Sequence, residues 1–252
     1  MEDFLERVRR IQAAQQAGRT FDFESMLERH YQRFLRAGDA VIDVGAHTGR
    51  HLAKFIECVG PSGHVLAFEP LPFAFQELRS RFRQSNVALK NVALSDAEGS
   101  VSFVHAQGTP EESGLRQRIY NNPDAAKPVT IEVVTETLDR YVGAAAGLKY
   151  IKIDVEGGEL NVLSGGTRML AAHRPWVSVE YGHPGYSVYG HTLYTLFDFA
   201  QEHGYEMFDI FGHRLGRAEW PMACDSICWD FFMVPSEKAE QFESLIPPVP
   251  ID

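Results

Sequence analysis

A glycine-rich turn between a short apolar run and a helical segment constrains the fold of this chain most strongly. The run is AVIDV at residues 40–44, and the turn after it has glycine at positions 45 and 49. A short apolar run of this kind is typical of a parallel strand that is buried on both faces, and glycine permits the tight turn into the next helix. The segment therefore predicts a strand–turn–helix unit of an α/β protein.

The same alternation of strand and helix continues along the chain. The expected strands are residues 40–44, 64–69, 87–94, 150–154 and 176–180, and the expected helices are 50–59, 72–84, 159–170 and 193–203. Two last strands, at 205–211 and 227–234, follow each other without a helix, which predicts an antiparallel pair. We therefore expect seven core strands in one mostly parallel sheet that is covered by helices.

Two parts of the chain lie outside this alternation. Residues 1–37 are expected to form an N-terminal helical cap with helices at 2–17 and 24–37 that ends at Gly38, and residues 38–252 a single core domain. Residues 100–105 and 129–135 alternate like strands and predict an inserted hairpin. The long loop between them, 106–128, is rich in Gly, Pro, Asn and Gln, and loops of this length in a compact domain are usually functional or disordered.

Composition excludes several classes of protein. Hydrophobic residues make up 44% of the 252, which is enough for one sizeable core. The net charge of −10 belongs entirely to residues 129–252, and an acidic surface of this kind disfavours nucleic acid as a partner. The sequence shows neither a secretory signal nor a membrane-spanning run. Its three cysteines, Cys58, Cys224 and Cys228, predict free thiols in the cytoplasm rather than a zinc site or disulfides.

Two features predict a nucleoside cofactor. Asp43-x-Gly45-x-x-x-Gly49 lies at the end of the first strand, where glycine lets a ligand approach the backbone closely. Glu69 ends the second strand, where a carboxylate can accept hydrogen bonds from both hydroxyls of a ribose. Each feature alone is also compatible with a plain structural turn or an exposed acid.

The spacing of the glycines favours S-adenosylmethionine. A dinucleotide fold has G-x-G-x-x-G, but His47 stands where that pattern has its second glycine. S-adenosylmethionine has a ribose for Glu69, an amino-acid head for the glycine turn, and no phosphates. A nicotinamide-dependent oxidoreductase and a non-catalytic nucleoside-binding module remain the alternatives.

The densest group of polar residues is YIKIDVEGGE at 150–159. Three acids fall within six residues at the end of a predicted strand, the edge at which open α/β sheets bind ligands. Lys152 and Asp154 share one face of that strand. Capping of the following helix by Asp154 or Glu156 is the alternative interpretation.

The motifs VIDVGAHTG, VLAFEP, NVALSDAEGSVSF, TLD, YIKIDVEGGELNVLSG and VSVEYG together resemble the FkbM family of class I S-adenosylmethionine-dependent methyltransferases. The resemblance covers roughly residues 24–182. It implies a Rossmann-like three-layer sandwich whose seven-stranded sheet has an antiparallel last strand. It also implies O-methylation of a hydroxyl group on a sugar, a glycan, or a glycosylated or macrolide-type natural product.

The resemblance also assigns cofactor-binding residues. The methionine part would lie against Asp43, Gly45, Ala46 and Gly49, the ribose hydroxyls against Glu69, and the adenine near Asn91 to Ala93. His47 and Pro70 are also expected to bind the cofactor. His47 is a departure, because the family usually has Asn there; both side chains can form hydrogen bonds.

Three residues are candidates for the chemistry: Asp154, Glu180 and His183. A sugar hydroxyl needs a positioned base or a metal to lose its proton. Asp154, which the resemblance places at the reaction centre, and Glu180 end neighbouring strands and could share Mg²⁺. His183 has an ordinary pKa near neutrality.

Aromatic residues suggest where an acceptor binds. Tyr181, Tyr186, Tyr189 and His191 lie in the glycine-rich segment 182–192 or beside it, which we expect to cover a small-molecule or glycan acceptor together with 106–128, unless it only packs in the core. Trp220, Trp229, Phe231 and Phe232 are expected in the core or at the dimer face of a homo-oligomer.

Overall fold

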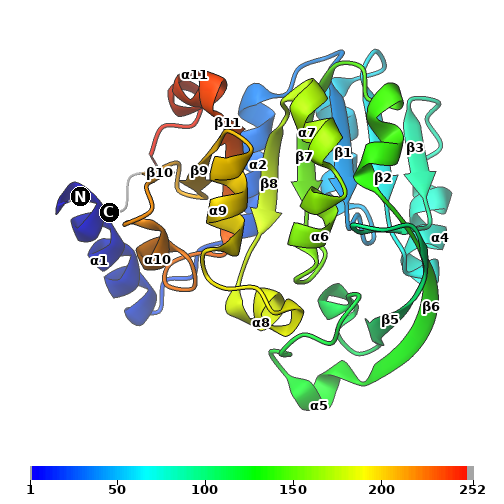
Figure 1. The fold of residues 1–252 in the computed structure, drawn as a ribbon, viewed down its shortest axis with the longest axis horizontal. Coiled ribbons are helices and arrows are strands. Elements are labelled where there is room, and N and C mark those ends of the chain that lie inside the picture. Colours follow the sequence, from blue (N-terminus) through cyan, green and yellow to red (C-terminus); the bar gives the residue numbers. More distant parts are fainter. Residues whose placement is uncertain (1, 249–252) are drawn as a thin grey trace.

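The structure of the protein is a computed structural model that describes residues 2–248; Met1 and the last four residues of the predicted core domain lie outside it. Its centre is an eight-stranded sheet with the order β10-β9-β11-β8-β7-β1-β2-β3 (Figure 1). The strands are β1 (Ala40–Val44), β2 (His64–Phe68), β3 (Val87–Lys90), β7 (Leu148–Ile153), β8 (Trp176–Glu180), β9 (Tyr205–Asp209), β10 (Arg214–Leu215) and β11 (Asp230–Pro235).

The sheet is parallel from β3 to β8 and antiparallel where β11 joins it. β11 lies between β8 and β9 and runs opposite to both, so the predicted antiparallel last strand is confirmed. The predicted seven strands become eight, because the two-residue strand β10 turns back along the edge of β9. This short strand falls in the polar connection between the last two predicted strands.

Helices cover the sheet on two faces, which gives three layers. Figure 1 shows α6 (Glu159–Ser164), α7 (Thr167–His173) and α9 (Thr195–Glu202) on the near face. The helices α3 (Arg50–Val59) and α4 (Pro72–Arg81) belong to crossovers that step along the sheet in the opposite direction. Right-handed crossovers therefore place them on the far face.

The N-terminal helices α1 (Glu2–Gln16) and α2 (Phe23–Phe34) share the main hydrophobic core with the sheet. The ring of Phe34 lies 4.6 Å from that of Trp176 on β8 and 5.2 Å from that of Tyr150 on β7. Tyr31 packs at 4.6 Å against Phe55 of α3. Helix α2 therefore packs directly against the central sheet. The domain boundary expected at residue 38 stays a prediction.

The third predicted strand, 87–94, is wrong in its second half. β3 ends at Lys90, and β4 (Ala93–Leu94) joins a second sheet of order β4-β6-β5. The chain turns between them because the side-chain amide of Asn91 donates to the carbonyl oxygens of Glu69 at 2.8 Å and Pro70 at 3.1 Å.

The second sheet contains the predicted inserted hairpin, formed by β5 (Gly99–Ala106) and β6 (Pro128–Glu136). Its connecting loop, residues 107–127, carries the short helices η1 (Pro110–Glu112) and α5 (Pro123–Ala126). Figure 1 shows α5 and β5 beyond the end of the sheet at which α8 (His183–Tyr186) also lies. The insert is therefore placed where it can cover a site at that edge.

Two helix predictions differ from the structure. The helix expected at 159–170 breaks at Gly165 and Gly166 into α6 and α7. Only glycine fits at position 165, because a Cβ atom there would lie 2.1 Å from the carbonyl oxygen of Ser95. The helix expected at 24–37 ends at Phe34 with Leu35 as its cap, not at Gly38. The remaining short elements are η2 (Leu138–Ala144), η3 (Ser187–Tyr189), α10 (Trp220–Ala223), η4 (Ser236–Lys238) and α11 (Ala239–Leu245).

The aromatic residues of the C-terminal strands divide into two groups. Trp220, Phe231 and Phe232 are fully buried, as predicted for core residues. Trp229 precedes β11 and is 49% exposed, so it lies outside the core and the other expectation for it, a dimer face, stays a prediction. Its ring makes a T-shaped contact with that of Phe23 at 5.7 Å. All three cysteines are free thiols. Within residues 2–248, no helix combines the length and apolar character needed to cross a membrane.

Candidate active site

A pocket of about 400 Å³ opens at the carboxyl ends of β1, β2, β7 and β8. This is the edge at which open α/β sheets bind their ligands. Seven of the residues that line it carry a carboxyl group: Glu24, Asp43, Glu69, Glu111, Asp154, Glu156 and Glu180. The basic side chains in its wall are Arg50, Lys152, His47 and His51. The pocket is therefore suited to a neutral or cationic ligand.

The glycine turn forms the floor between β1 and α3. Gly45 has φ of +82°, and a Cβ atom there would lie 1.9 Å from the carbonyl oxygen of Asp154. The amides of Gly45 and Ala46 both donate to the carbonyl oxygen of Phe68 at 3.0 Å. Only glycine fits this position, because its missing side chain lets the turn after β1 approach the backbone of Asp154 closely.

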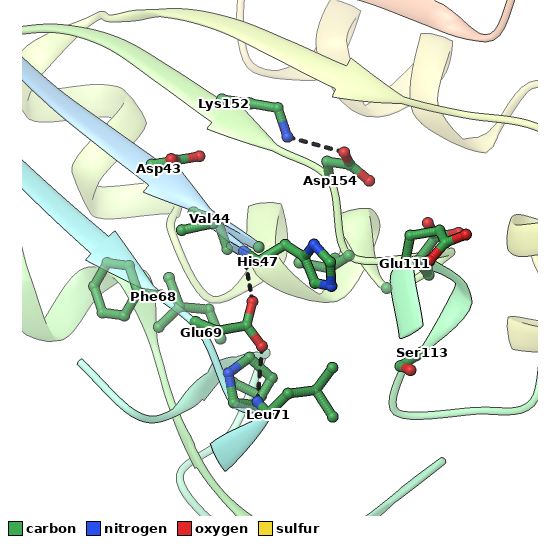
Figure 2. A pocket seen from close by; sticks show the side chains of 18 of the residues that line it. Asp43, Val44, His47, Phe68, Glu69, Leu71, Glu111, Ser113, Lys152 and Asp154 are labelled. Atoms are coloured by element: carbon green, nitrogen blue, oxygen red, sulfur yellow. Dashed lines mark hydrogen bonds and ion pairs between the residues drawn. The ribbon is translucent and has the colours of Figure 1, made fainter. Parts of the chain in front are cut away.

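Glu69 is fixed at the end of β2 by two backbone amides. Its Oε2 accepts from the amide of His47 at 2.7 Å, and its Oε1 accepts from that of Leu71 at 2.7 Å (Figure 2). Burial raises the pKa of Glu69 to about 7, although both hydrogen bonds favour the charged form. Each oxygen keeps a second lone pair, so the carboxylate is oriented to accept two further hydrogen bonds.

Lys152 forms an ion pair with Asp154 and lies beside Asp43 on the neighbouring strand. Its Nζ lies 2.9 Å from Oδ2 of Asp154, and Asp43 is its partner in the register of β1 with β7 (Figure 2). Burial opposes a charge on Lys152, but the carboxylates of Asp154 and Asp43 outweigh it and raise its pKa. Neither oxygen of Asp43 has a hydrogen-bond partner among residues 2–248, and burial raises its pKa.

Asp154 and Glu180 interact with each other, and their pKa values shift in opposite directions. Burial disfavours the Asp154 carboxylate, but Lys152 holds its pKa below the usual value. Burial, and next the negative charge of Asp154, raises the pKa of Glu180 well above its usual value. The two carboxyl groups are therefore a coupled pair in which Asp154 favours the charged form and Glu180 favours the protonated form.

The loop after β7 is held by a residue that the sequence did not single out for this role. Glu159 accepts hydrogen bonds at Oε1 from the amides of Val155 at 3.1 Å and Gly157 at 3.0 Å. Glu156 has a left-handed backbone with φ of +62°, which is uncommon outside glycine. Its carboxylate forms an ion pair with Arg118 of the insert.

Glu24 and His51 complete the pocket and were missed by sequence reasoning. His51 Nε2 lies 2.5 Å from Oε2 of Glu24, and its Nδ1 lies 3.2 Å from the hydroxyl group of Tyr31. Hydrogen bonding to His51 lowers the pKa of Glu24. Helix α2 precedes the strand–helix pattern, so the rule that strand ends meet at one edge of the sheet does not reach Glu24.

The insert supplies the outer wall. Pro110, Glu111, Ser113 and Leu115 line the pocket, and Figure 2 shows Glu111 and Ser113 on the side away from Asp43. The same segment contacts 182–192, since the amide of Ile119 donates to the carbonyl oxygen of Pro184 at 3.0 Å. The two segments expected to cover an acceptor are thus in contact with each other.

The structure brings most of the predicted site residues together. Asp43, Gly45, Ala46, His47, Glu69, Pro70, Ala93, Asp154 and Glu180 all line the pocket. The other three predicted site residues, Gly49, Asn91 and His183, are not among the described residues that line the pocket. Gly49 packs beneath it against Phe82 and Asn91 holds the backbone of Glu69, whereas the amide of His183 donates to Asp225 Oδ1 at 2.7 Å. His183 is therefore a residue of the loop, outside the wall formed by the residues described.

The sheet order and this pocket define a class I, Rossmann-like methyltransferase fold with a nucleoside site. The buried carboxyl group of Asp43, whose oxygens have no hydrogen-bond partner among residues 2–248, and the oriented carboxylate of Glu69 fit the cationic head and the ribose of S-adenosylmethionine. Residues 43–207 match the model of the methyltransferase FkbM domain. The chain belongs to this family of S-adenosylmethionine-dependent methyltransferases, and the predicted resemblance is confirmed.

Curated relatives match over parts of their length. The 31-O-demethyl-FK506 methyltransferase FkbM of Streptomyces tacrolimicus is 31% identical over 52% of this chain and 60% of its own. A protein-L-isoaspartate O-methyltransferase of Ignicoccus hospitalis is 36% identical over 27% of this chain and 32% of its own. The crystal structure of methyltransferase FkbM from Methylobacillus flagellatus KT covers 92% of this chain and 60% of that one, with 15% identity and a TM-score of 0.49.

Proposed function

We propose that this protein transfers a methyl group from S-adenosylmethionine to a hydroxyl oxygen of a neutral or cationic acceptor, such as a sugar, a glycan, or a glycosylated or macrolide-type natural product. The observation that carries the proposal is the charge arrangement at the end of β7. There Lys152 keeps the partly buried Asp154 ionised in the pocket. The proposal includes a reducing, cytoplasmic setting, which the three free thiols support.

The cofactor would be held by residues at the ends of β1 and β2. Glu69 accepts hydrogen bonds from the ribose hydroxyls, and Asp43 offers an unpaired carboxyl group to the methionine ammonium. Pro70 and Ala93 line the wall where the adenine would lie, with Asn91 fixing the backbone behind them. When bound, S-adenosylmethionine supplies a methyl group that is activated by its sulfonium charge.

Asp154 takes the role of proton acceptor. An alcohol oxygen becomes strongly acidic as its bond to the methyl carbon forms, so even a carboxylate of low pKa can remove the proton late in the step. Lys152 keeps Asp154 charged and fixed in position. Burial and the charge of Asp154 raise the pKa of Glu180, and in its protonated form Glu180 can donate a hydrogen bond to another oxygen of the acceptor.

The acidic wall argues against a carboxylate as acceptor. An acceptor with its own negative charge would meet Glu24, Glu111 and Asp154. Such like-charge contacts are unfavourable in a partly buried pocket. Protein carboxyl methylation, which the name of the Ignicoccus hospitalis relative indicates for that enzyme, is therefore disfavoured here.

The proposal is tested in two steps. Isothermal titration calorimetry with S-adenosylmethionine and S-adenosylhomocysteine should show micromolar binding; absence of binding to both would contradict the cofactor assignment. Transfer of radiolabelled methyl groups is then measured on polyols, amino sugars, glycosides and macrolides. Methyl ethers survive mild alkali whereas methyl esters do not, so an alkali-labile product would contradict O-methylation of a hydroxyl group.

A further inference from the structure

Three carboxyl groups at the acceptor end of the pocket have the spacing of a cation site. Asp154, Glu156 and Glu180 each offer one oxygen, and the three oxygens lie within 4.8 Å of one another. Such a set of oxygen ligands suits Mg²⁺ or Mn²⁺. The sequence predicted a metal at two of these residues, Asp154 and Glu180.

The cluster already has two cations of the protein beside it. Lys152 contacts Asp154 at 2.9 Å from the side of the sheet. Arg118 forms an ion pair with Glu156 from the side of the insert. The side chains of Arg118 and Glu156 are only 10% and 12% exposed, so this pair is shielded from solvent. The positive charges of Lys152 and Arg118 repel a divalent cation at this cluster, and the wild-type site therefore does not fit a resident metal.

Arg118 belongs to a loop that is attached to the site by further contacts. The Arg116 guanidinium donates to the carbonyl oxygen of Val188 at 3.0 Å and lies 5.2 Å from the centre of the Tyr189 ring. Ile119 bonds to Pro184 through its backbone amide. The Arg118–Glu156 pair is the charged contact that fixes this loop to the end of β7.

We propose that Arg118 is the built-in counter-cation of the carboxylate cluster, so that docking of loop 107–127 and binding of a divalent cation exclude each other. The guanidinium group neutralises Glu156 while the loop covers the acceptor end. Withdrawal of the loop exposes three oxygens that can bind a divalent cation. The inference does not rest on the proposed acceptor or on methyl transfer.

The experiment measures Mn²⁺ binding by electron paramagnetic resonance and the exchange of amide hydrogens in residues 107–127. Arg118→Gln is expected to bind Mn²⁺ at least tenfold more tightly than the wild type and to exchange faster in this loop. Arg118→Lys keeps the charge and is expected to bind Mn²⁺ as weakly as the wild type. The double variant Arg118→Gln with Glu156→Gln is expected to bind Mn²⁺ as weakly as the wild type, because one of the three carboxylates is missing.

Arg140→Gln is the matched control, because Arg140 forms an exposed ion pair with Glu98 away from the pocket. It should leave both measurements at wild-type values. Equal Mn²⁺ affinity of Arg118→Gln and the wild type would overturn the inference, and so would unchanged exchange in the loop. Tight binding by Arg118→Lys, or by the double variant, would also overturn it. None of these readouts needs cofactor or turnover, so failure of the proposed function would leave the result interpretable.

Discussion

The ammonium group of Lys152 lies 2.9 Å from Oδ2 of Asp154, and residue 152 is in register with Asp43 on the neighbouring strand. Without Lys152, the partly buried Asp154 would lose its ion-pair partner, and the buried Asp43 would lose a nearby positive charge. Breaking a buried ion pair on one side typically costs more than the pair contributes, since the remaining charge stays without a partner. This relationship explains how a sheet edge rich in acids remains folded.

Replacement of Lys152 by methionine is therefore expected to lower the free energy of unfolding by about 3 kcal/mol. Urea denaturation followed by circular dichroism measures this change. Lys54→Met is the control, because Lys54 pairs with Glu57 on the surface of α3 and such pairs contribute little. A loss as small as that of the control would show that Asp154 and Asp43 do not depend on Lys152.

Asp154→Asn is expected to reduce turnover by about 100-fold or more, because it removes the proton acceptor. Affinity for S-adenosylmethionine should stay within a few-fold of the wild type, since the ribose and methionine contacts lie on β1 and β2. Single-turnover kinetics and calorimetry separate the two effects. Normal turnover in this variant would return Asp154 to a structural role in the loop after β7.

Binding of S-adenosylmethionine is expected to release a proton below pH 7. Burial raises the pKa of Glu69 to about 7 in the folded protein, but the ribose hydroxyls need the charged form as acceptor. Affinity should therefore rise with pH and level off above about pH 7. Titrations at pH 6 in two buffers of different ionisation enthalpy measure the proton directly.

Two variants identify the source of that proton. Glu69→Gln should abolish the release and weaken binding at least tenfold, as expected for hydrogen bonds to a charged group. Glu159→Gln is the matched control, because burial also raises the pKa of Glu159 to about 7 but its carboxylate bonds only to the backbone of its own loop. Release that persists in Glu69→Gln would contradict the ribose assignment.

The same raised pKa predicts how stability depends on pH. The folded protein holds the Glu69 proton more tightly than the unfolded chain, whose carboxyl has its ordinary pKa of 4.5. The contribution of Glu69 to the free energy of unfolding is therefore greatest below about pH 4.5 and is lost as the pH rises toward 7. Urea denaturation between pH 4 and 7 measures the free energy of unfolding of the wild type and of Glu69→Gln. The difference between the two proteins should decline as the pH rises.

The parts of the site that the sequence predicted correctly share one property: they lie at the ends of strands. Gly45, Glu69 and Asp154 follow apolar runs directly, and the topology of a parallel sheet brings such strand ends to one edge. That reasoning needs only local patterns and a fold class. It also led to the expectation that the insert covers the site, and residues of the insert do line the pocket.

The parts that the sequence did not predict depend on contacts between distant segments. Glu24 and His51 meet across α2 and α3, and no local pattern records that pairing. His183 follows a strand by only a few residues, yet the loop turns it toward Asp225. The break at Gly165 depends on the approach of Ser95 from the second sheet.

Gly45→Ala and Gly190→Ala distinguish conformational strain from steric exclusion. Both glycines have a left-handed backbone, with φ of +82° and +78°, but a Cβ atom at Gly190 meets nothing within 4 Å. Gly190→Ala should cost about 1 kcal/mol from backbone strain alone. Gly45→Ala should cost roughly 3 kcal/mol or more and abolish cofactor binding, because the carbonyl oxygen of Asp154 occupies that space. Equal losses would mean that the turn relaxes freely.

Helix α2 is expected to unfold together with the sheet rather than as a separate cap. Phe34 is buried against Trp176 and Tyr150, and truncation of a buried phenylalanine costs about 3–5 kcal/mol. Phe34→Ala should therefore lower the stability of the whole protein by about that amount in a single transition, seen alike by circular dichroism and tryptophan fluorescence. Phe73→Ala is the control, because Phe73 is exposed and its loss should change stability by about 0.5 kcal/mol or less. Two separate transitions, with only the first shifted in Phe34→Ala, would instead establish residues 1–37 as an independent cap.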